Sequence, residues 1–215
     1  CLDRGGLVGE DGVTHHGVFD MAAFGAVPGL VIAAPMNEPE LRNAMYTALL
    51  AGGPFMIRYP RGHGEGLPWR GMPFEALPVG RGRRLREGRD VALVTVGTVG
   101  NAAARAAERA AAEGVEAAHY DLRWVKPLDT ELLDEVGRTF RRVVTVEDGC
   151  LRGGVGEAVA AYFNARGYDA RVTSLGIGDE WVEHGTPEQL HTLCGYDEEA
   201  IFRALAGVKH LSQER

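Results

Sequence analysis

The sequence lacks any long apolar stretch. No window holds the roughly eighteen consecutive apolar residues that a membrane-spanning helix needs. The opening residues, Cys-Leu-Asp-Arg, also lack the charged start and apolar centre of a secretory signal peptide. We therefore predict a cytoplasmic protein with no membrane partner.

Cysteine is scarce as well. The three cysteines, Cys1, Cys150 and Cys194, do not have the spacing of metal ligands. A sparse, odd-numbered set is typical of a reducing compartment, where disulfides are rare. The sequence therefore predicts neither a disulfide scaffold nor a metal site built on cysteine.

An excess of positive charge is absent too. The chain has 23 Lys and Arg against 30 Asp and Glu, which gives a net charge of −7 and a pI near 5.5. This balance argues against a nucleic-acid partner, which needs a basic face. The one dense basic run, 81–89, has no interleaved aromatic residues. We expect it to form a solvated hairpin with Glu87 and Gly88 in its turn.

What the sequence does contain is an alternation of strands and helices. The apolar run 30–34 ends at Pro35 and is typical of a buried parallel strand. Asn37 is the expected N-cap of a helix that continues to Ala51, before two glycines. A second strand follows over 55–59. Strand, helix and strand in this order predict a βαβ unit with a parallel sheet.

A second α/β pattern follows an irregular stretch. Residues 62–79 are rich in Gly and Pro, have no period, and are expected to link two domains. Beyond them, the pattern predicts an α/β fold with a doubly wound sheet. The expected strands are 91–96, 115–122, 143–146 and 171–175, and the expected helices are 101–113, 129–137, 157–166, 187–194 and 198–206.

One loop, GEDGVTHHGVFD over residues 9–20, combines acids, imidazoles and glycines. Histidine can move protons or donate to a developing oxyanion, and glycine lets a backbone approach a ligand closely. Asp11, His15 and His16 are therefore candidate site residues. A histidine that caps a helix or pairs with a carboxylate explains them equally well. Adjacent histidines in an extended loop point in different directions, so we expect at most one to face a substrate.

Arginines mark the end of the second predicted strand, in Arg58-Tyr59-Pro60-Arg61. Ligands of open α/β sheets bind at the carboxyl ends of the strands, and arginine suits phosphate or carboxylate. One such arginine is better explained by an ion pair. Arg4 and Arg61 together favour an anionic substrate.

Three other polar motifs favour structural roles. The glycine run 153–156 opens a helix but matches no nucleotide-binding pattern. Glu147 and Asp148 end a predicted strand and are expected to cap a helix or lie at a domain interface. His184 is a single loop histidine, for which a structural role is favoured.

Taken in order, five motifs resemble one family over nearly the whole chain. The chain resembles the C-terminal part of the 1-deoxy-D-xylulose 5-phosphate synthases, which are thiamine-diphosphate enzymes related to transketolase. The first and second motifs are the specific ones. The motifs are LDRGGLVGEDGVTHHGVFD, RYPRG, DLRWVKPLD, VTVED with GGVGEAV, and LGIGDEWVEHG.

The resemblance implies two α/β/α domains. Residues 1–61 would be the second half of a pyrimidine-binding domain, 62–79 a linker, and 80–215 a transketolase-type C-terminal domain. The cofactors would be thiamine diphosphate and Mg²⁺. The metal ligands and the glutamate that activates the cofactor would lie in an N-terminal portion of the same polypeptide. We expect this chain to be a fragment that is inactive alone.

The resemblance also assigns the site. The family joins pyruvate to glyceraldehyde 3-phosphate with loss of carbon dioxide, for isoprenoid, thiamine and pyridoxal biosynthesis. His15 would protonate the alkoxide that forms at the acceptor aldehyde, and Asp11 would hold an acceptor hydroxyl. Arg4 and Arg61 would hold the acceptor phosphate. The family precedent is a homodimer.

Two alternatives stay open at this point. Another thiamine-diphosphate enzyme, either a transketolase or a 2-oxoacid dehydrogenase β subunit, would share the fold. Donor choice separates these enzymes, because the synthase uses pyruvate and transketolase uses a ketose phosphate. The isolated chain is alternatively a non-catalytic dimerisation module.

Overall fold

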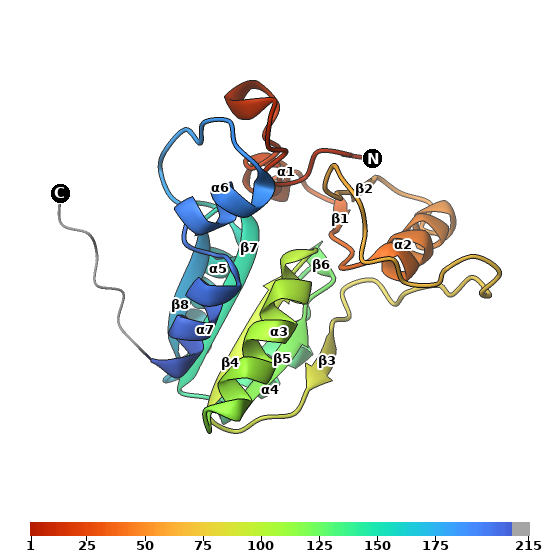
Figure 1. The fold of residues 1–215 in the computed structure, drawn as a ribbon. Coiled ribbons are helices and arrows are strands. Elements are labelled where there is room, and N and C mark those ends of the chain that lie inside the picture. The colour runs from red at the N-terminus through yellow and green to blue at the C-terminus, as the bar shows by residue number, and fades with distance from the viewer. Residues whose placement is uncertain (208–215) are drawn as a thin grey trace.

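A computed structural model describes residues 1–207 and shows two α/β regions side by side (Figure 1). Residues 208–215 of the predicted C-terminal domain lie outside the described range. The first region runs from red to orange in Figure 1, and the second from yellow-green to blue. No helix among the described residues has the length and apolarity needed to cross a membrane.

The first region is a βαβ unit preceded by loops and two short helices. The parallel pair of β1 and β2 confirms the predicted unit. Asn37 caps α2 as expected, because its side-chain oxygen accepts a hydrogen bond from Glu40 N at 3.1 Å. The elements are η1 (Gly12–Thr14), α1 (Asp20–Gly25), β1 (Val31–Ala33), α2 (Glu38–Leu50) and β2 (Phe55–Ile57).

The second region is a five-stranded sheet in the order β3-β5-β4-β7-β8, in which only β3 is antiparallel. Helices cover both faces, so the predicted doubly wound α/β fold is confirmed. The elements are β3 (Arg83–Arg86), β4 (Val91–Val96), α3 (Val99–Ala112), β5 (Ala117–Asp121), β6 (Trp124–Lys126), α4 (Thr130–Thr139), β7 (Arg142–Cys150), α5 (Val155–Arg166), β8 (Arg171–Ile177), α6 (Pro187–Leu193) and α7 (Glu198–Ala206).

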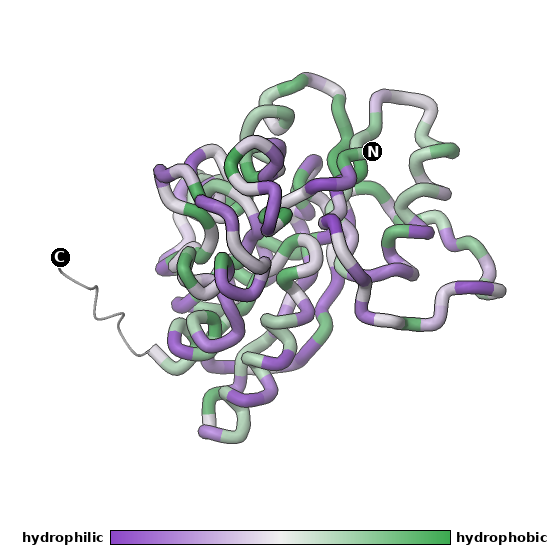
Figure 2. The backbone as a smooth tube through the Cα atoms, turned by 45° about the horizontal axis from the view of Figure 1, so that its top comes forward, coloured by the Kyte–Doolittle hydropathy of each residue, from purple (hydrophilic) through white to green (hydrophobic). Residues whose placement is uncertain are grey.

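Each face of this sheet has its own core. On one face, α3 packs through alanines at helical spacing, Ala103, Ala106, Ala107 and Ala110, all with 0% exposure. Small side chains let the helix lie close to the sheet. On the other face, α4 and α5 bury larger apolar residues such as Phe163. The alternation of hydrophobic and hydrophilic segments along the chain in Figure 2 reflects this one-sided burial.

One strand joins the two regions. β6 belongs to the second region in sequence, yet it pairs antiparallel with β1 and completes a three-stranded sheet, β2-β1-β6. The strand prediction ended at Leu122 and missed it. Three residues before a proline give almost no local strand signal, and the partner Ala33 lies far away in sequence.

The predicted hairpin over 81–89 is wrong. β3 does not pair with the next strand, β4, but lies antiparallel to β5 at the edge of the sheet. Its arginines find carboxylates there: Arg83 contacts Asp121 and Glu40, and Arg84 contacts Glu135. Pairing with β5 is favoured because β3 then covers the outer edge of that strand, and its arginines form ion pairs with nearby carboxylates.

Residues 62–79 contain no helix or strand, as expected of a connecting segment. They nevertheless pack along α2. Arg42 donates to the carbonyl of Pro73 at 2.9 Å, and Thr47 accepts from Leu77 N at 2.8 Å. Leu77 is buried at 5% exposure. The segment is therefore tied to the first region over its second half.

Candidate functional site

The start of the chain runs beside β2 and places two predicted arginines at the same edge. Leu2 forms a parallel bridge with Arg58, and Gly5 N donates to Tyr59 O at 2.9 Å. Arg4 and Arg61 therefore flank a shared backbone hydrogen bond at the carboxyl end of β2. This is the edge at which open α/β sheets bind ligands.

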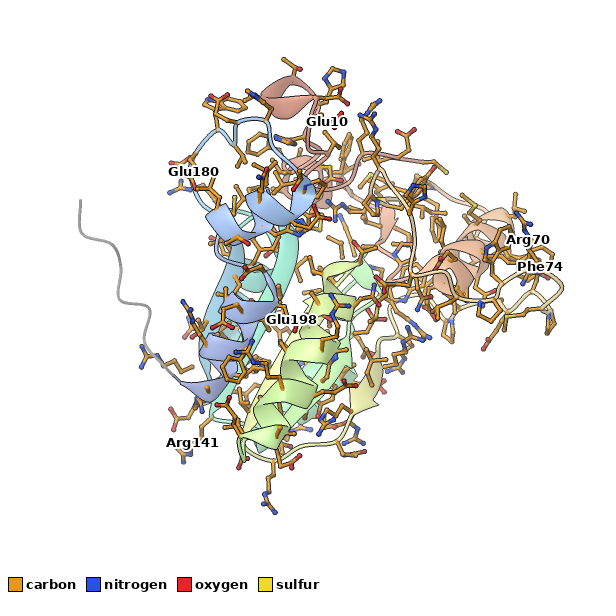
Figure 3. The ribbon with its side chains drawn as sticks, in the orientation of Figure 1. Glu10, Arg70, Phe74, Arg141, Glu180 and Glu198 are labelled. Carbon is orange, nitrogen blue, oxygen red and sulfur yellow. The ribbon has the colours of Figure 1, made fainter. Side chains whose placement is uncertain are left out.

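The glycine-rich loop is closed at its base. Gly6 and Gly17 exchange two backbone hydrogen bonds of 2.9 Å. The residues between them therefore form a loop that leaves and rejoins the first region at one point. Gly9 and Gly12 have φ values of +90° and +64°, a region that glycine adopts without strain. The tip of this loop, marked by Glu10 in Figure 3, lies at the surface of the molecule.

Asp11 and Arg61 meet directly. The Arg61 guanidinium contacts the Asp11 carboxylate, and the two side chains are 48% and 33% exposed. The structure thus brings together two of the four predicted site residues. The pair is open to solvent, so both groups are accessible to a small polar ligand.

Arg4 is partly buried, just before Gly5, whose backbone is bonded to Tyr59. Its Nε is buried and has no hydrogen-bond partner within residues 1–207. A buried donor without an acceptor costs free energy unless a ligand satisfies it. Arg4 is therefore suited to an anion that is not part of the described chain.

The two adjacent histidines have different environments, as the sequence predicts. His15 is exposed on the loop, with Nδ1 2.8 Å from Thr14 Oγ1. His16 turns inward, where its Nδ1 accepts from Val8 N at 3.1 Å and its Nε2 lies 3.4 Å from Glu183 O. His16 therefore holds the loop, and His15 is the imidazole available to a ligand.

Arg58 is a buried structural residue. Its Nε donates to Asp20 at 2.7 Å, and the two side chains are only 4% and 7% exposed. Its Nη2 also donates to the carbonyl of Asp148 at 3.0 Å. The ion-pair interpretation of a lone strand-end arginine therefore holds for Arg58.

Glu147 explains the glycine run that follows it. Its carboxylate accepts from Val155 N and Gly156 N, both at 2.8 Å, at the N-terminus of α5. A protein carboxylate thus occupies the position where a phosphate would bind. Burial raises the pKa of Glu147 to about 7, despite the two backbone hydrogen bonds. The predicted capping role is confirmed.

Asp148 points to the opposite side of β7, toward the first region, and confirms the predicted interface role. Its Oδ1 accepts from Leu7 N at 3.0 Å and from the Tyr196 hydroxyl at 2.8 Å. His191 Nε2 lies 3.8 Å from Oδ2, an ion-pair contact beyond hydrogen-bond reach. Burial acts to raise the pKa of Asp148, but His191, Arg58 and Tyr196 outweigh it and hold the pKa below its usual value.

Sequence reasoning missed His191 and Tyr196. Both lie beyond the recognised motifs, at the end of α6 and in the turn before α7. Their rings pack together at a tilt of 43°, with centroids 4.9 Å apart. No sequence signal pairs them with Asp148, because the contact depends on how α6 folds back over the end of β7.

A cleft of about 1040 Å³ separates the two regions. One wall is formed by 35–38 and 59–65, and the other by α3, α6 and the start of α7. Glu198 reaches across from α7 to Arg105 of α3 at 2.8 Å, and Figure 3 shows it in front of α3. Arg61, Asp148, His191 and Tyr196 all line this cleft.

Residues 1–207 hold no group of three or more His, Cys, Asp or Glu side chains placed to bind a metal ion. His184 is exposed and packs against Gly12 of the loop, which agrees with a structural role. The described residues thus offer two arginines, a carboxylate and an imidazole, but no group of metal ligands.

Comparison with known proteins gives the family. Residues 1–65 match the transketolase pyrimidine-binding domain, and residues 80–201 match the transketolase C-terminal domain. The chain is 54% identical over 207 residues to 1-deoxy-D-xylulose-5-phosphate synthase of Bacteroides fragilis, covering 95% of this chain and 32% of the relative. It is 44% identical over 215 residues to the synthase of Porphyromonas gingivalis, covering 100% of this chain and 33% of the relative.

A solved structure agrees. The structure described as "Split gene transketolase, inactive beta4 tetramer" superposes with a TM-score of 0.79 and 30% sequence identity, covering 91% of this chain and 62% of its own. The chain spans about a third of the length of the curated relatives, 32–33% in these cases. The chain therefore belongs to the transketolase family of thiamine-diphosphate enzymes, and over 95% of its length it is highly similar to 1-deoxy-D-xylulose-5-phosphate synthases.

Proposed function

We propose that this chain is part of a synthase that condenses pyruvate with glyceraldehyde 3-phosphate, releasing carbon dioxide, to give 1-deoxy-D-xylulose 5-phosphate. The product would serve isoprenoid, thiamine and pyridoxal biosynthesis. The observation that carries the proposal is the contact between Asp11 and Arg61, together with the buried Nε of Arg4, which has no partner among the described residues. A carboxylate and two arginines suit a substrate that has both a hydroxyl and a phosphate.

Arg4 and Arg61 would bind the acceptor phosphate. A guanidinium presents a planar fork of donors that matches phosphate oxygens. Arg61 would exchange its contact with Asp11 for the phosphate, and Arg4 would supply the buried Nε that lacks an acceptor in the described chain. Asp11, once released, would accept a hydrogen bond from an acceptor hydroxyl.

His15 would act as the general acid. When a carbon nucleophile adds to the acceptor aldehyde, the carbonyl oxygen becomes an alkoxide that must take a proton. The contact of Nδ1 with Thr14 Oγ1 orients the ring, so that Nε2 would give its proton to that oxygen. Solvent would then reprotonate the imidazole, which the exposure of His15 permits.

Thiamine diphosphate, when bound, supplies the carbanion chemistry that removes carbon dioxide from pyruvate. Since the chain spans about a third of the length of its relatives, we propose that Mg²⁺ and the diphosphate are bound by another portion of the full-length polypeptide. We also propose a cytoplasmic homodimer.

Carbon dioxide release tests this function. The full-length gene product is supplied with thiamine diphosphate, Mg²⁺ and pyruvate, with and without glyceraldehyde 3-phosphate, and the present chain serves as control. We expect acceptor-stimulated release by the full-length protein and none by the chain. No release with any acceptor would refute the synthase function, and ketose phosphates would then be tested as donors for the transketolase alternative.

A further inference from the structure

We infer that Asp148 and Tyr196, both from the C-terminal domain, are positioning residues for the loop that carries Asp11 and His15. The catalytic meaning of this inference rests on the proposed function. Neither residue is one of the four predicted to touch the substrate. Their effect on the reaction would pass through the main chain of the loop.

The contact is made at the base of the loop. Asp148 accepts the Leu7 N–H at 3.0 Å through the same oxygen, Oδ1, that accepts the Tyr196 hydroxyl at 2.8 Å. All three residues are buried, with 2% exposure for Leu7, 6% for Asp148 and 1% for Tyr196. A hydrogen bond to a charged acceptor in a dry site is stronger than one between neutral groups.

The sequence at the loop base is adapted to this close approach. Gly6 has φ +87°, and a Cβ there would overlap the carboxylate of Asp148. A side chain at this position would therefore push the loop off the C-terminal domain. Gly6 also pairs with Gly17, so the carboxylate lies against the point where the two ends of the loop meet.

Arg58 ties the second end of the loop to the same residue. Its Nη2 donates to the carbonyl of Gly17 at 3.3 Å and to the carbonyl of Asp148 at 3.0 Å. Both ends of the loop thus depend on Asp148, one through its side chain and one through its main chain. A shift of Asp148 would therefore move the whole loop that carries Asp11 and His15.

Tyr196 sets the orientation of the carboxylate. Burial and the neighbouring Asp148 raise the pKa of Tyr196, so its hydroxyl stays protonated and can only donate to that acceptor. Without this donor, the carboxylate loses one of the two hydrogen bonds at Oδ1 and can rotate away from Leu7 N. The loop base then loses its fixed point.

The test uses Tyr196→Phe in the full-length protein, with Tyr168→Phe as matched control. Tyr168 also donates from its hydroxyl to a carboxylate, Asp134 Oδ1, at 2.8 Å in the same domain but away from the loop. Hydrogen exchange is followed in peptides that span residues 5–17. Initial rates are measured while the acceptor and pyruvate are varied separately.

In Tyr196→Phe we expect loop exchange to quicken and the KM for glyceraldehyde 3-phosphate to rise about tenfold, the scale of one hydrogen bond to a charged group. The KM for pyruvate should stay within about twofold, and Tyr168→Phe should match wild type in every reading. Unchanged loop exchange in Tyr196→Phe would overturn the inference. Faster exchange with an unchanged acceptor KM would overturn the positioning of the substrate-binding groups.

A further outcome and a second variant complete the test. A full-length protein that releases no carbon dioxide from pyruvate would refute the proposed function. Faster loop exchange in Tyr196→Phe would still show that Asp148 and Tyr196 hold the base of the loop. Should Tyr196→Phe not fold, Asp148→Asn replaces it, since the amide keeps an oxygen for Leu7 N but loses the charge. Faster loop exchange in that variant supports the inference, and wild-type exchange overturns it.

Discussion

The Arg61 guanidinium contacts the Asp11 carboxylate across 50 residues of sequence, near the tip of a glycine-rich loop. In the proposed reaction the two side chains bind different groups of one acceptor. Their contact neutralises both charges while the acceptor is absent. The acceptor must therefore separate the two side chains when it binds. The contact of its hydroxyl with Asp11 and the contact of its phosphate with Arg61 would then form together.

Arg61→Ala in the full-length protein should raise the KM for glyceraldehyde 3-phosphate and leave that for pyruvate nearly unchanged. Losing one charge-assisted phosphate contact should cost about 1.5–3 kcal/mol. Steady-state kinetics with each substrate varied measures both constants. Arg70→Ala is the control, because Arg70 is exposed on the irregular segment far from the loop (Figure 3). An unchanged acceptor KM would remove Arg61 from the phosphate site.

His15→Ala should slow product formation by about a hundredfold or more, the usual contribution of a positioned general acid. Rapid-quench measurement of product separates this step from carbon dioxide release, which should be less affected. His63→Ala, which removes another exposed histidine that lies outside the loop, should form product at the wild-type rate. Full product formation by His15→Ala would end its assignment as the acid.

Glu147→Gln should remove a pH dependence of stability. Because the pKa of Glu147 is raised from 4.5 to about 7 by burial, the folded state holds this proton more tightly than the unfolded state. The contribution is present below pH 4.5 and is lost as the pH rises to about 7. The free energy of unfolding of wild type should therefore fall by about 3 kcal/mol relative to the variant over this window.

Denaturant unfolding at several pH values measures the difference. Glu113→Gln is the control, since Glu113 is exposed and is not among the groups that shift the pKa of Glu147. It should follow the pH profile of wild type. Parallel profiles for wild type and Glu147→Gln would show that this carboxyl titrates as it does in the unfolded chain.

His119 should give the free energy of unfolding the opposite dependence on pH. Burial lowers its pKa from 6.5 to about 4, and it lies neutral beside Thr95, with Nε2 2.9 Å from Oγ1. Its contribution is present above pH 6.5 and is lost as the pH falls to about 4, because the unfolded state then takes up the proton first. His119→Gln should lose less stability than wild type on acidification, by about 3 kcal/mol. His63→Gln, at an exposed histidine, should behave as wild type.

Glu40→Ala should loosen the junction of the two regions. Glu40 is 6% exposed and accepts from Arg83 Nη1 at 2.8 Å and from Arg123 Nε at 2.8 Å. Removing it leaves two half-buried guanidinium groups without this partner and should cost about 3 kcal/mol in thermal or denaturant unfolding. Glu131→Ala, which breaks an exposed pair with Arg81, should have a much smaller effect. Equal effects would contradict the role of the buried network.

Local signals were enough for the elements that depend on neighbours in sequence. The cap of α2 was predicted from Asn37, whose side chain accepts a hydrogen bond from the backbone N–H three residues on. The parallel strands were predicted from short β-branched runs bounded by Gly or Pro. The placement of Arg61 at the carboxyl edge of the sheet followed from the strand predicted just before it.

Long-range pairing was not predictable in this way. The three residues of β6 and the four of β3 have little pattern of their own, and their partners are chosen by the sheet edges left open after folding. The contact of Asp148 with Leu7 and Tyr196 joins positions up to 141 residues apart. No periodicity of sequence encodes such a separation.

The sequence by itself determined the class of fold, the glycine loop with its acid and histidines, and the acid pair at the end of β7. Only the tertiary structure decided which histidine faces outward, which arginine is buried with Asp20 and which is free to meet Asp11. The physical reason is burial. A side chain becomes structural or available according to whether a distant segment covers it, and that covering is a property of the packed chain.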